Sequence, residues 1–441
     1  MRVKSVEIKG LYHQFNYNIV IGDGVQLLTG LNGYGKTTIM RLIDGLAQKN
    51  LYYFYVTPYD SITFAIDDES TIFVSSSYAR KETGKARDER LSPSRKIVFT
   101  WVDKNGFKRG ELVMDEDSIS WAHHNLSKYG DMDDSQEVDF LSMDFYHSAK
   151  ENGLPLEIAG LQGKLASQFM MLLGTIKSYL IEAERTVIYK SIHNTGVDYD
   201  LNGVSKFEID VCNDILRQYL KEQYDGYKKH VAILDEKFVD NALKLDREYS
   251  EEEYQTEATK LSERKLELLK TGLIDSFDIR AYSTSNAKML TAYIVSQNAK
   301  LDFHNELLGK LRLFSDLIAS KRFVNKHLEI SKDAGLRFMA GEGGYIDLNR
   351  LSSGEQNEVI MLYYLIFKVK DGSTLLIDEP ETSLHVLWQN EYVSNIERIA
   401  KLKDLSVVVS THSPQIIGSR WADCYDLTEV AERDEQYSGK S

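Results

Sequence analysis

Residues 30–38, GLNGYGKTT, combine three glycines with a lysine and two threonines, residue types that bind phosphate groups. Glycines let the backbone curl so that its N–H groups face phosphate oxygens, and a following helix adds the positive end of its dipole. The apolar run VQLLT precedes the segment and the helical pattern KTTIMRLIDGLA follows it, which is the context that a phosphate-binding loop requires. The residues that we predict to contact a bound nucleotide are Asn32, Gly33, Tyr34, Gly35, Lys36, Thr37 and Thr38.

Two side chains of this loop and one distant carboxylate have individual predicted roles. Lys36 should reach the β- and γ-phosphates and take part in catalysis by stabilising their charge. Thr37 should place its hydroxyl on Mg²⁺, a hard cation that accepts few protein oxygens and keeps several waters. Asp378 ends the apolar run TLLID, and we expect it to be the second protein group that helps to hold this ion.

Two further strand ends carry groups that could act on a nucleotide. Glu379 follows Asp378 directly, and His412 follows the apolar run LSVVVST. Because ligands of open α/β sheets bind at the carboxyl ends of the strands, both side chains should meet the phosphate loop. We predict Glu379 as the base or positioner of an attacking water, and His412 as a hydrogen-bonding partner of the γ-phosphate or of that water.

A second segment suited to anions lies more than three hundred residues after the loop. LSSGEQNEV should begin a helix, where hydroxyls, N–H groups and the helix dipole attract phosphate. Two phosphate cradles in one chain are redundant unless two copies face each other head to tail. We therefore expect a homodimer, or a higher oligomer built from such dimers, that closes on bound nucleotide. The predicted contacts of this segment are Ser352, Ser353, Gly354 and Glu355.

The surrounding patterns indicate an α/β fold that positions these residues. Short β-rich runs in the first thirty residues lead into the loop, and LYYFYV, SITFAI, TIFVSS and KIVFTWV between about residues 51 and 125 predict a mostly antiparallel β region. Apolar residues at helical spacing from 209 to 245 predict one long helix or a broken pair. The alternation of strand and helix patterns near the C-terminus predicts a parallel sheet.

These patterns divide the chain into four predicted parts. Residues 1–205 form an N-terminal lobe with the phosphate loop and the β-rich region, and residues 206–330 form an α-helical insertion. Strict heptads are not sustained there, which favours a compact helical subdomain over a long coiled-coil arm. Residues 331–430 form a C-terminal lobe, and residues 431–441 belong to a polar tail that we expect to be frayed after Leu427.

Composition and charge narrow the class of protein. The 441 residues are 42% hydrophobic and 27% charged, which is typical of globular proteins. No run of eighteen apolar residues or export signal is present, so we expect a cytoplasmic protein without a membrane segment. Cys212 and Cys424 lack metal-type spacing. The net charge of −14 argues against general nucleic-acid affinity, and the basic stretch 79–96 is predicted to be a solvated loop, with DNA or partner contact as the alternative.

Taken together, the motifs resemble those of the ABC-type ATPase superfamily, in the branch that contains RecF, SMC and OLD-family proteins. Residues 30–38 resemble its Walker A loop, 351–355 its signature motif, 375–385 its Walker B motif with D-loop, and 410–417 its switch-histidine region. The resemblance implies a P-loop NTPase fold like that of SMC and RecF heads. It also implies hydrolysis of ATP to ADP and phosphate, with ATP and Mg²⁺ as cofactors.

Two features of that superfamily are harder to place on this chain. LIEAER at 180–185 resembles the glutamine loop, but Glu184 stands where relatives often carry glutamine. Tyr12 and Phe15 are the candidates for an aromatic residue that contacts adenine, with packing in the core as the alternative that we favour.

The C-terminal block, from LSSGEQNEVIMLYYLIFK to THSPQIIGSRW, is similar to stand-alone ATPases of bacterial anti-phage defence, such as AriA of PARIS and PtuA of Septu. That resemblance implies a separately encoded effector nuclease, TOPRIM-like or HNH in type, which the ATPase holds or licenses. The alternative is a RecF/SMC-like ATPase that acts on DNA in repair or chromosome maintenance. A transporter motor is disfavoured, because a large insertion separates the loop from the signature.

Overall fold

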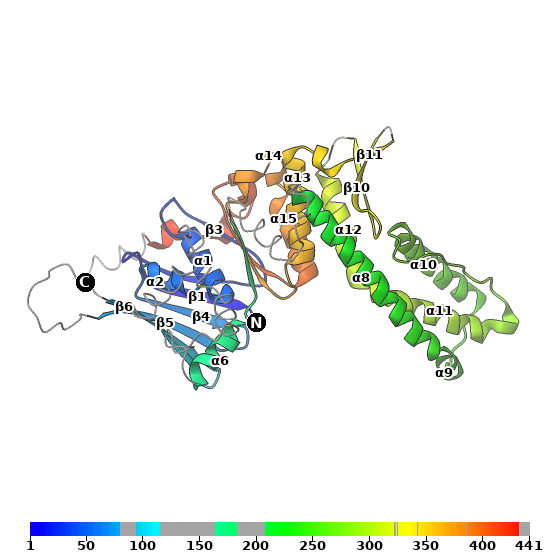
Figure 1. The fold of residues 1–441 in the computed structure, drawn as a ribbon, viewed down its shortest axis with the longest axis horizontal. Helices are drawn as coiled ribbons and strands as arrows, with labels where there is room; N and C mark the ends of the chain where they lie inside the picture. Colours follow the sequence, from blue (N-terminus) through cyan, green and yellow to red (C-terminus); the bar gives the residue numbers. More distant parts are fainter. Residues whose placement is uncertain are drawn as a thin grey trace, which may run out of the picture. The chain divides into compact units, whose positions relative to one another are not determined.

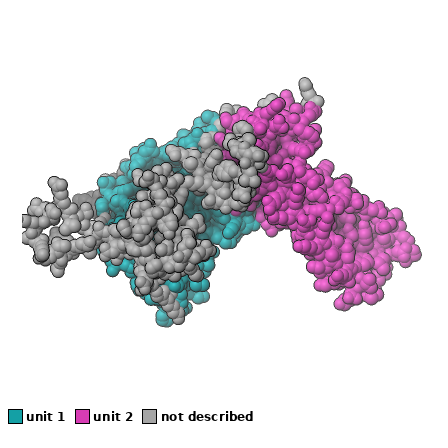
Figure 2. All heavy atoms as spheres, in the orientation of Figure 1, with its two compact units in different colours: residues 1–188, 369–441 teal, residues 189–368 magenta. Residues whose placement is uncertain are grey.

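The computed structural model describes residues 1–79, 94–114, 164–182 and 208–431, apart from residues 322, 324, 342 and 385. The chain splits into two compact units. The first comprises residues 1–188 and 369–441 and the second residues 189–368, shown in teal and magenta in Figure 2. Within the described part of the chain, no helix is long and apolar enough to cross a bilayer.

The first unit contains a five-stranded sheet in which all paired strands are parallel. In spatial order its strands are β14 (Cys424–Asp426), β3 (Gly24–Thr29), β13 (Ser406–Ser410), β12 (Thr374–Asp378) and β8 (Ser178–Ile181). Every residue of β12 and β13 is buried, which explains why both strands are almost continuously apolar. The structure thus confirms the predicted parallel sheet.

Helix α1 (Lys36–Gln48) follows β3 and packs on β8 and β12, while α15 (Tyr392–Lys403) packs on β3. The residues between β12 and β13 include a second, short helix, α14 (Val386–Gln389), which ends before α15 begins. The apolar face expected for α1 is buried in full, and its residues are Ile39, Leu42, Ile43 and Leu46.

A six-stranded antiparallel sheet completes the first unit and confirms the predicted β region. In spatial order its strands are β2 (Phe15–Val20), β1 (Val3–Leu11), β4 (Ser61–Ile66), β5 (Thr71–Ala79), β6 (Ser94–Val102) and β7 (Lys108–Met114). Helix α6 (Lys164–Leu173) packs on β7, as Figure 1 shows below the sheet. Side chains of both sheets and of α1 contribute to one hydrophobic core. Most of the basic stretch 79–96 lies outside the described residues.

One part of the β-region prediction is wrong. The run LYYFYV was expected to be a strand, but residues Tyr52–Val56 form the short helix α2. Phe54 on α2 is fully buried, and its ring contacts those of Phe64 and Phe99 on the antiparallel sheet. Burying this aromatic side chain in the shared core outweighs the intrinsic β preference of Tyr, Phe and Val.

The second unit is mainly helical. For residues 209–245, the sequence predicted either one long helix or a broken pair. The structure has the broken pair, which consists of α8 (Glu208–Glu236) and α9 (Phe238–Leu243). Only the first half of α8 is buried, through Ile209, Cys212, Leu216 and Leu220. Figure 1 shows α8 as the longest helix of this unit, with α11 beside it. The remaining helices of this block are α10 (Glu251–Lys270), α11 (Ala287–Leu301) and α12 (Asn305–Ser320).

The second unit also contains a small antiparallel sheet and the helix that carries the predicted signature. The sheet consists of β9 (Lys326–Ser331), β10 (Gly335–Ala340) and β11 (Tyr345–Ile346). Helix α13 (Ser353–Tyr363) continues into a five-residue π-helix, Tyr364–Lys368. The domain boundaries predicted at 205/206 and 330/331 differ from the boundaries of the second compact unit, which spans residues 189–368. β10 packs on α8, β9 packs on α12, and α13 packs on both helices, while β11 pairs with β10, so these elements belong to the helical unit.

A carboxyl group with little solvation lies on α1. The Oδ1 atom of Asp44 is buried and has no hydrogen-bond partner among the described residues. Burial raises the pKa of Asp44 to about 6, and hydrogen bonds with Ser178 and Gln48 offset this only in part. Because the pKa in the folded state exceeds that of the unfolded chain, the native state binds the extra proton. Its stability therefore falls as the pH rises from about 4 to about 6.

The substitution Asp44→Asn should remove this pH dependence. The neutral amide carries no cost of burying a charge, so the variant should gain roughly 2 kcal/mol more stability relative to wild type at pH 8 than at pH 4. Urea unfolding of both proteins at the two pH values measures this difference. If the free energies of unfolding of variant and wild type differ by the same amount at pH 4 and at pH 8, Asp44 titrates normally in the folded protein.

Candidate functional site

The predicted phosphate loop joins β3 to α1 in the first unit. Gly35 is the N-cap of α1 with φ 90°, a left-handed conformation that favours glycine. A Cβ atom at Gly35 would lie 2.9 Å from Leu11 Cδ2, so the Leu11 side chain would have to move. At the other end of the loop, a Cβ on Gly30 would lie 3.1 Å from Leu427 Cβ. Both positions combine a positive φ with little space for a side chain, which favours glycine.

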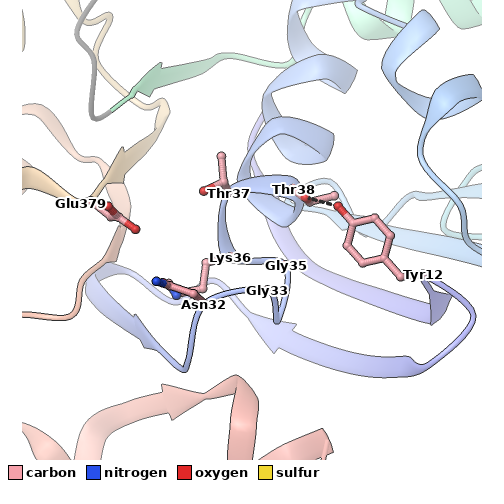
Figure 3. A pocket seen from close by; sticks show the side chains of 8 residues that line it. All are labelled: Tyr12, Asn32, Gly33, Gly35, Lys36, Thr37, Thr38 and Glu379. Carbon is pink, nitrogen blue, oxygen red and sulfur yellow. Dashed lines mark hydrogen bonds between the residues drawn. The ribbon is translucent and has the colours of Figure 1, made fainter.

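A pocket of about 440 Å³ opens at this loop, and Figure 3 shows it from close by. Its volume is within the range of small-molecule sites. All of its lining residues belong to the first unit. Six of them come from the predicted loop, and Glu379 and Tyr12 complete the lining, which consists of Tyr12, Asn32, Gly33, Gly35, Lys36, Thr37, Thr38 and Glu379.

The ammonium group of Lys36 is held by the loop itself. Lys36 Nζ donates to the carbonyl oxygens of Gly30 and Leu31 at 2.9 and 3.3 Å. An ammonium group has three donors, so one remains for a phosphate oxygen. Burial lowers the pKa of Lys36, while the nearby carboxylates of Glu379 and Asp378 act in the opposite direction. The residue is only 5% exposed, which strengthens its attraction for an anion in the pocket.

Two oxygen donors suited to Mg²⁺ lie together at the start of α1 and the end of β12. Thr37 Oγ1 donates to Asp378 Oδ2 at 2.7 Å, and Ser410 Oγ donates to Asp378 Oδ1. Asp378 is 5% exposed, so its orientation is set by these two hydroxyls. A hydroxyl and one carboxylate fit a Mg²⁺ ion that also binds phosphates and water. In the described ranges, no group of three or more His, Cys, Asp or Glu side chains could hold a metal by itself.

The two predicted catalytic strand ends are adjacent. Parallel pairing places Asp378 beside Ser410, and the N–H of Glu379 donates to the carbonyl of Ser410 at 3.0 Å. His412 Nε2 lies 3.7 Å from Glu379 Oε1. Glu379 has φ 42° and ψ 58°, a left-handed conformation that is strained for a residue with a side chain. The structure thus brings Glu379 and His412 together and places Glu379 in the lining of the pocket.

The aromatic residues near the loop fall into two groups. Tyr12 lines the pocket, and its hydroxyl lies 2.6 Å from Thr38 Oγ1. Phe15 stacks on Tyr34 with ring centroids 5.2 Å apart, and the Tyr34 carbonyl accepts a hydrogen bond from Tyr17. Phe15 therefore packs against other aromatic side chains, as the alternative to an adenine contact predicted. Tyr34, predicted to contact nucleotide, is not among the lining residues in the described part of the chain.

The predicted signature segment lies in the second unit, at the start of α13. Ser352 is the N-cap and forms a capping box with Glu355, which also accepts from Lys326 Nζ at 2.6 and 2.7 Å. Burial alone would raise the pKa of Glu355, but hydrogen bonds from Lys326 and Ser352 hold it below its usual value. The Glu355 carboxylate thus stabilises the helix start. Ser353 and Gly354 are exposed, and nothing lies within 4 Å of a Cβ built on Gly354.

The segment after β14 supports the loop, which the sequence did not indicate. Residues 427–431 form a helical turn, and Leu427 is fully buried. Thr428 Oγ1 accepts from the N–H of Leu31 at 2.9 Å, and Thr29 Oγ1 donates to Asp426 Oδ2 at 3.2 Å. The expectation of a frayed chain after Leu427 is therefore wrong for residues 428–431. Residues 432–441 and Glu184 of the predicted glutamine loop lie outside the described residues.

Two substitutions separate nucleotide binding from hydrolysis at this site. Lys36→Ala should weaken ATP binding at least about tenfold, because it removes a charge-assisted hydrogen bond to phosphate. Glu379→Gln should bind ATP normally and lower kcat about 100-fold or more, because an amide cannot act as a base for the water. Calorimetric titration with ATP and steady-state phosphate release measure both effects.

The exposed Glu69 on the β4–β5 turn offers a matched control. Glu69→Gln makes the same chemical change as Glu379→Gln and should leave binding and turnover at wild-type values. Equal rates for Glu379→Gln and wild type would exclude the predicted role of Glu379.

Comparison with known proteins shows the family to which the chain belongs. The family model described as an AAA ATPase domain matches residues 1–417. No curated protein shows a match to the chain. Similar solved structures include an SMC head bound to the C-winged helix domain of ScpA, with 12% identity, a TM-score of 0.38, and coverage of 96% of this chain and 93% of that chain. Another is the SMC head domain from Thermotoga maritima, with 9% identity, a TM-score of 0.31, and coverage of 95% and 91%. Because the family model spans nearly the whole sequence, the chain belongs to the AAA ATPase domain family and is an ATPase.

Proposed function

We propose that the pocket at the phosphate loop binds ATP with Mg²⁺ and that Glu379 and His412 act on the γ-phosphate end. The observation that carries this proposal is the convergence of Lys36, Thr37, Asp378 and Glu379 at one edge of the parallel sheet. A bound Mg²⁺ would supply positive charge that offsets the charge of the phosphates. Thr37 and Asp378 would hold the ion.

The side chains around the γ-phosphate have distinct tasks in this proposal. Lys36 donates a hydrogen bond from its remaining N–H to a phosphate oxygen and stabilises negative charge in a poorly solvated site. The carboxylate of Glu379 accepts a hydrogen bond from the attacking water and orients it in line with the bond that breaks. His412, 3.7 Å from that carboxylate, is within reach of the same water or of the phosphate.

The exposed start of α13 supports a second proposal, that two copies close head to tail on ATP. Its N–H groups, the Ser353 hydroxyl and the space beside Gly354 form an anion-attracting helix end, while the pocket is lined by residues of the first unit. In a two-fold dimer each copy donates its loop to one site and its α13 end to the other. Binding of ATP then stabilises the dimer, and loss of the γ-phosphate weakens it.

Mixing two inactive variants tests the head-to-tail dimer. Lys36→Ala removes the loop function and Ser353→Arg obstructs the α13 end, so each variant alone should hydrolyse ATP very slowly. An equal mixture forms heterodimers with one intact composite site, so activity should return to about a quarter of the wild-type rate. Phosphate release by the mixture and by each variant alone gives the answer.

A control mixture distinguishes complementation between two subunits from the sum of the residual activities of the two variants. Combining Lys36→Ala with Ser353→Arg in one chain leaves no intact site when that chain is mixed with Lys36→Ala. This second mixture should stay inactive. The composite site would be rejected if both variants are folded and form mixed dimers in the presence of ATP, but the first mixture does not regain activity.

The biological setting that we propose is bacterial anti-phage defence, with a separately encoded effector nuclease of TOPRIM-like or HNH type as the partner. Support for this setting comes from the motif block at residues 351–421, which resembles stand-alone defence ATPases. The product of the neighbouring gene should copurify with this chain and be released or activated when ATP is hydrolysed. If instead DNA stimulates hydrolysis, with binding that weakens steeply with salt, the alternative role in DNA repair or chromosome maintenance applies.

A further inference from the structure

The ends of β12 and β13 are joined by side chains as well as by the sheet ladder. Asp378 accepts from the Ser410 hydroxyl, and the Glu379 N–H donates to the Ser410 carbonyl. Beyond the two strand ends, Glu381 makes a third connection, to Thr411 and His412. This glutamate is not part of the pocket lining, and neither the loop nor the metal donors use it.

The turn after β12 aims Glu381 back at the end of β13. Glu379 adopts its left-handed conformation, and the 3-10 turn Pro380–Ser383 follows at once. The N–H and the hydroxyl of Thr382 donate to the Glu379 carbonyl at 3.2 and 2.9 Å, which closes the turn. The conformation of Glu379 and the direction of Glu381 are therefore set by the same few residues.

Both carboxylate oxygens of Glu381 have donors from the next strand end. Oε2 accepts from Thr411 Oγ1 at 2.9 Å, and Oε1 accepts from the backbone N–H of His412 at 2.6 Å. Hydrogen bonds to an ionised acceptor are stronger than those between neutral groups. Glu381 thus anchors the main chain at His412.

The side chain of His412 depends on that anchor. Its imidazole is 38% exposed, and its Nε2 lies 3.7 Å from Glu379 Oε1. For a ring exposed to this extent, the placement of the backbone that carries it is decisive for where the imidazole lies. Small errors in the placement of a group that acts on the reacting atoms reduce the rate strongly while binding is unchanged.

We propose that Glu381 is a positioning residue for ATP hydrolysis, which holds the main chain of His412 so that its imidazole lies beside Glu379. The proposal rests on the proposed role of His412. It predicts a defect in turnover and not in nucleotide affinity, because Lys36 and the loop do not contact Glu381 through hydrogen bonds in the described structure. Gln at position 381 keeps an acceptor for the His412 N–H, whereas Ala does not.

A double-mutant cycle tests this role. Glu381→Ala should lower kcat roughly tenfold through the loss of charge-assisted hydrogen bonds. The Kd for ATP should remain within about twofold, since the loop is intact. In a His412→Ala background, the same substitution should lower kcat no further, because Glu381 acts through His412. Glu381→Gln should recover most of the lost turnover.

Several results would overturn the proposal. A loss of turnover for Glu381→Ala that persists in the His412→Ala background would indicate a structural role instead. Equal impairment of Glu381→Gln and Glu381→Ala, with weaker ATP binding, would assign the effect to the charge near Lys36. If Glu381→Ala does not fold, Thr411→Val removes one donor and should give a smaller loss that again disappears without His412.

The cycle also separates this proposal from the assignment of His412. A wild-type rate for His412→Ala would remove the catalytic role of His412, and the role of Glu381 with it. A slow His412→Ala enzyme whose rate falls further with Glu381→Ala would reject the positioning role alone. Thermal unfolding midpoints of all variants confirm that the compared proteins are folded.

Discussion

Parallel pairing of β13 with both β12 and β3 is the constraint on which the site depends. The register that pairs Asp378 with Ser410 and Ser410 with Leu28 makes the three strands end at one edge of the sheet. The phosphate loop leaves β3 at that edge, and the acidic residues leave β12 there. Because ladder hydrogen bonds fix this register, groups more than three hundred residues apart meet within hydrogen-bonding distance.

The site is also a place where the protein keeps unfavourable local features. Lys36 and Asp378 are almost completely buried, and Glu379 is left-handed, which costs about 1–2 kcal/mol for a residue with a side chain. The two buried charges are offset by specific bonds: loop carbonyls hold Lys36, and hydroxyls of Thr37 and Ser410 hold Asp378. Such groups are oriented before a ligand arrives, so binding does not have to order them.

Agreement between sequence and structure is best where a pattern is long or a motif is complete. The helix at α1, the parallel strands β12 and β13 and the long helix α8 all follow from period and length. The prediction failed for LYYFYV, where the burial of Phe54 decides the conformation, and for residues 428–431, where Thr428 contacts the loop. Both failures concern short segments whose structure depends on distant partners.

The sequence by itself determined the types of group available to the site: a glycine loop with Lys36, a carboxylate pair after an apolar strand, and serines before a helix. It did so because local backbone requirements and strand burial leave direct marks on residue order. Tertiary structure alone decided that Glu381 binds the main chain of His412 and that Ser410 orients Asp378. These contacts join residues on different strands, and their geometry follows from sheet register, which no local pattern contains.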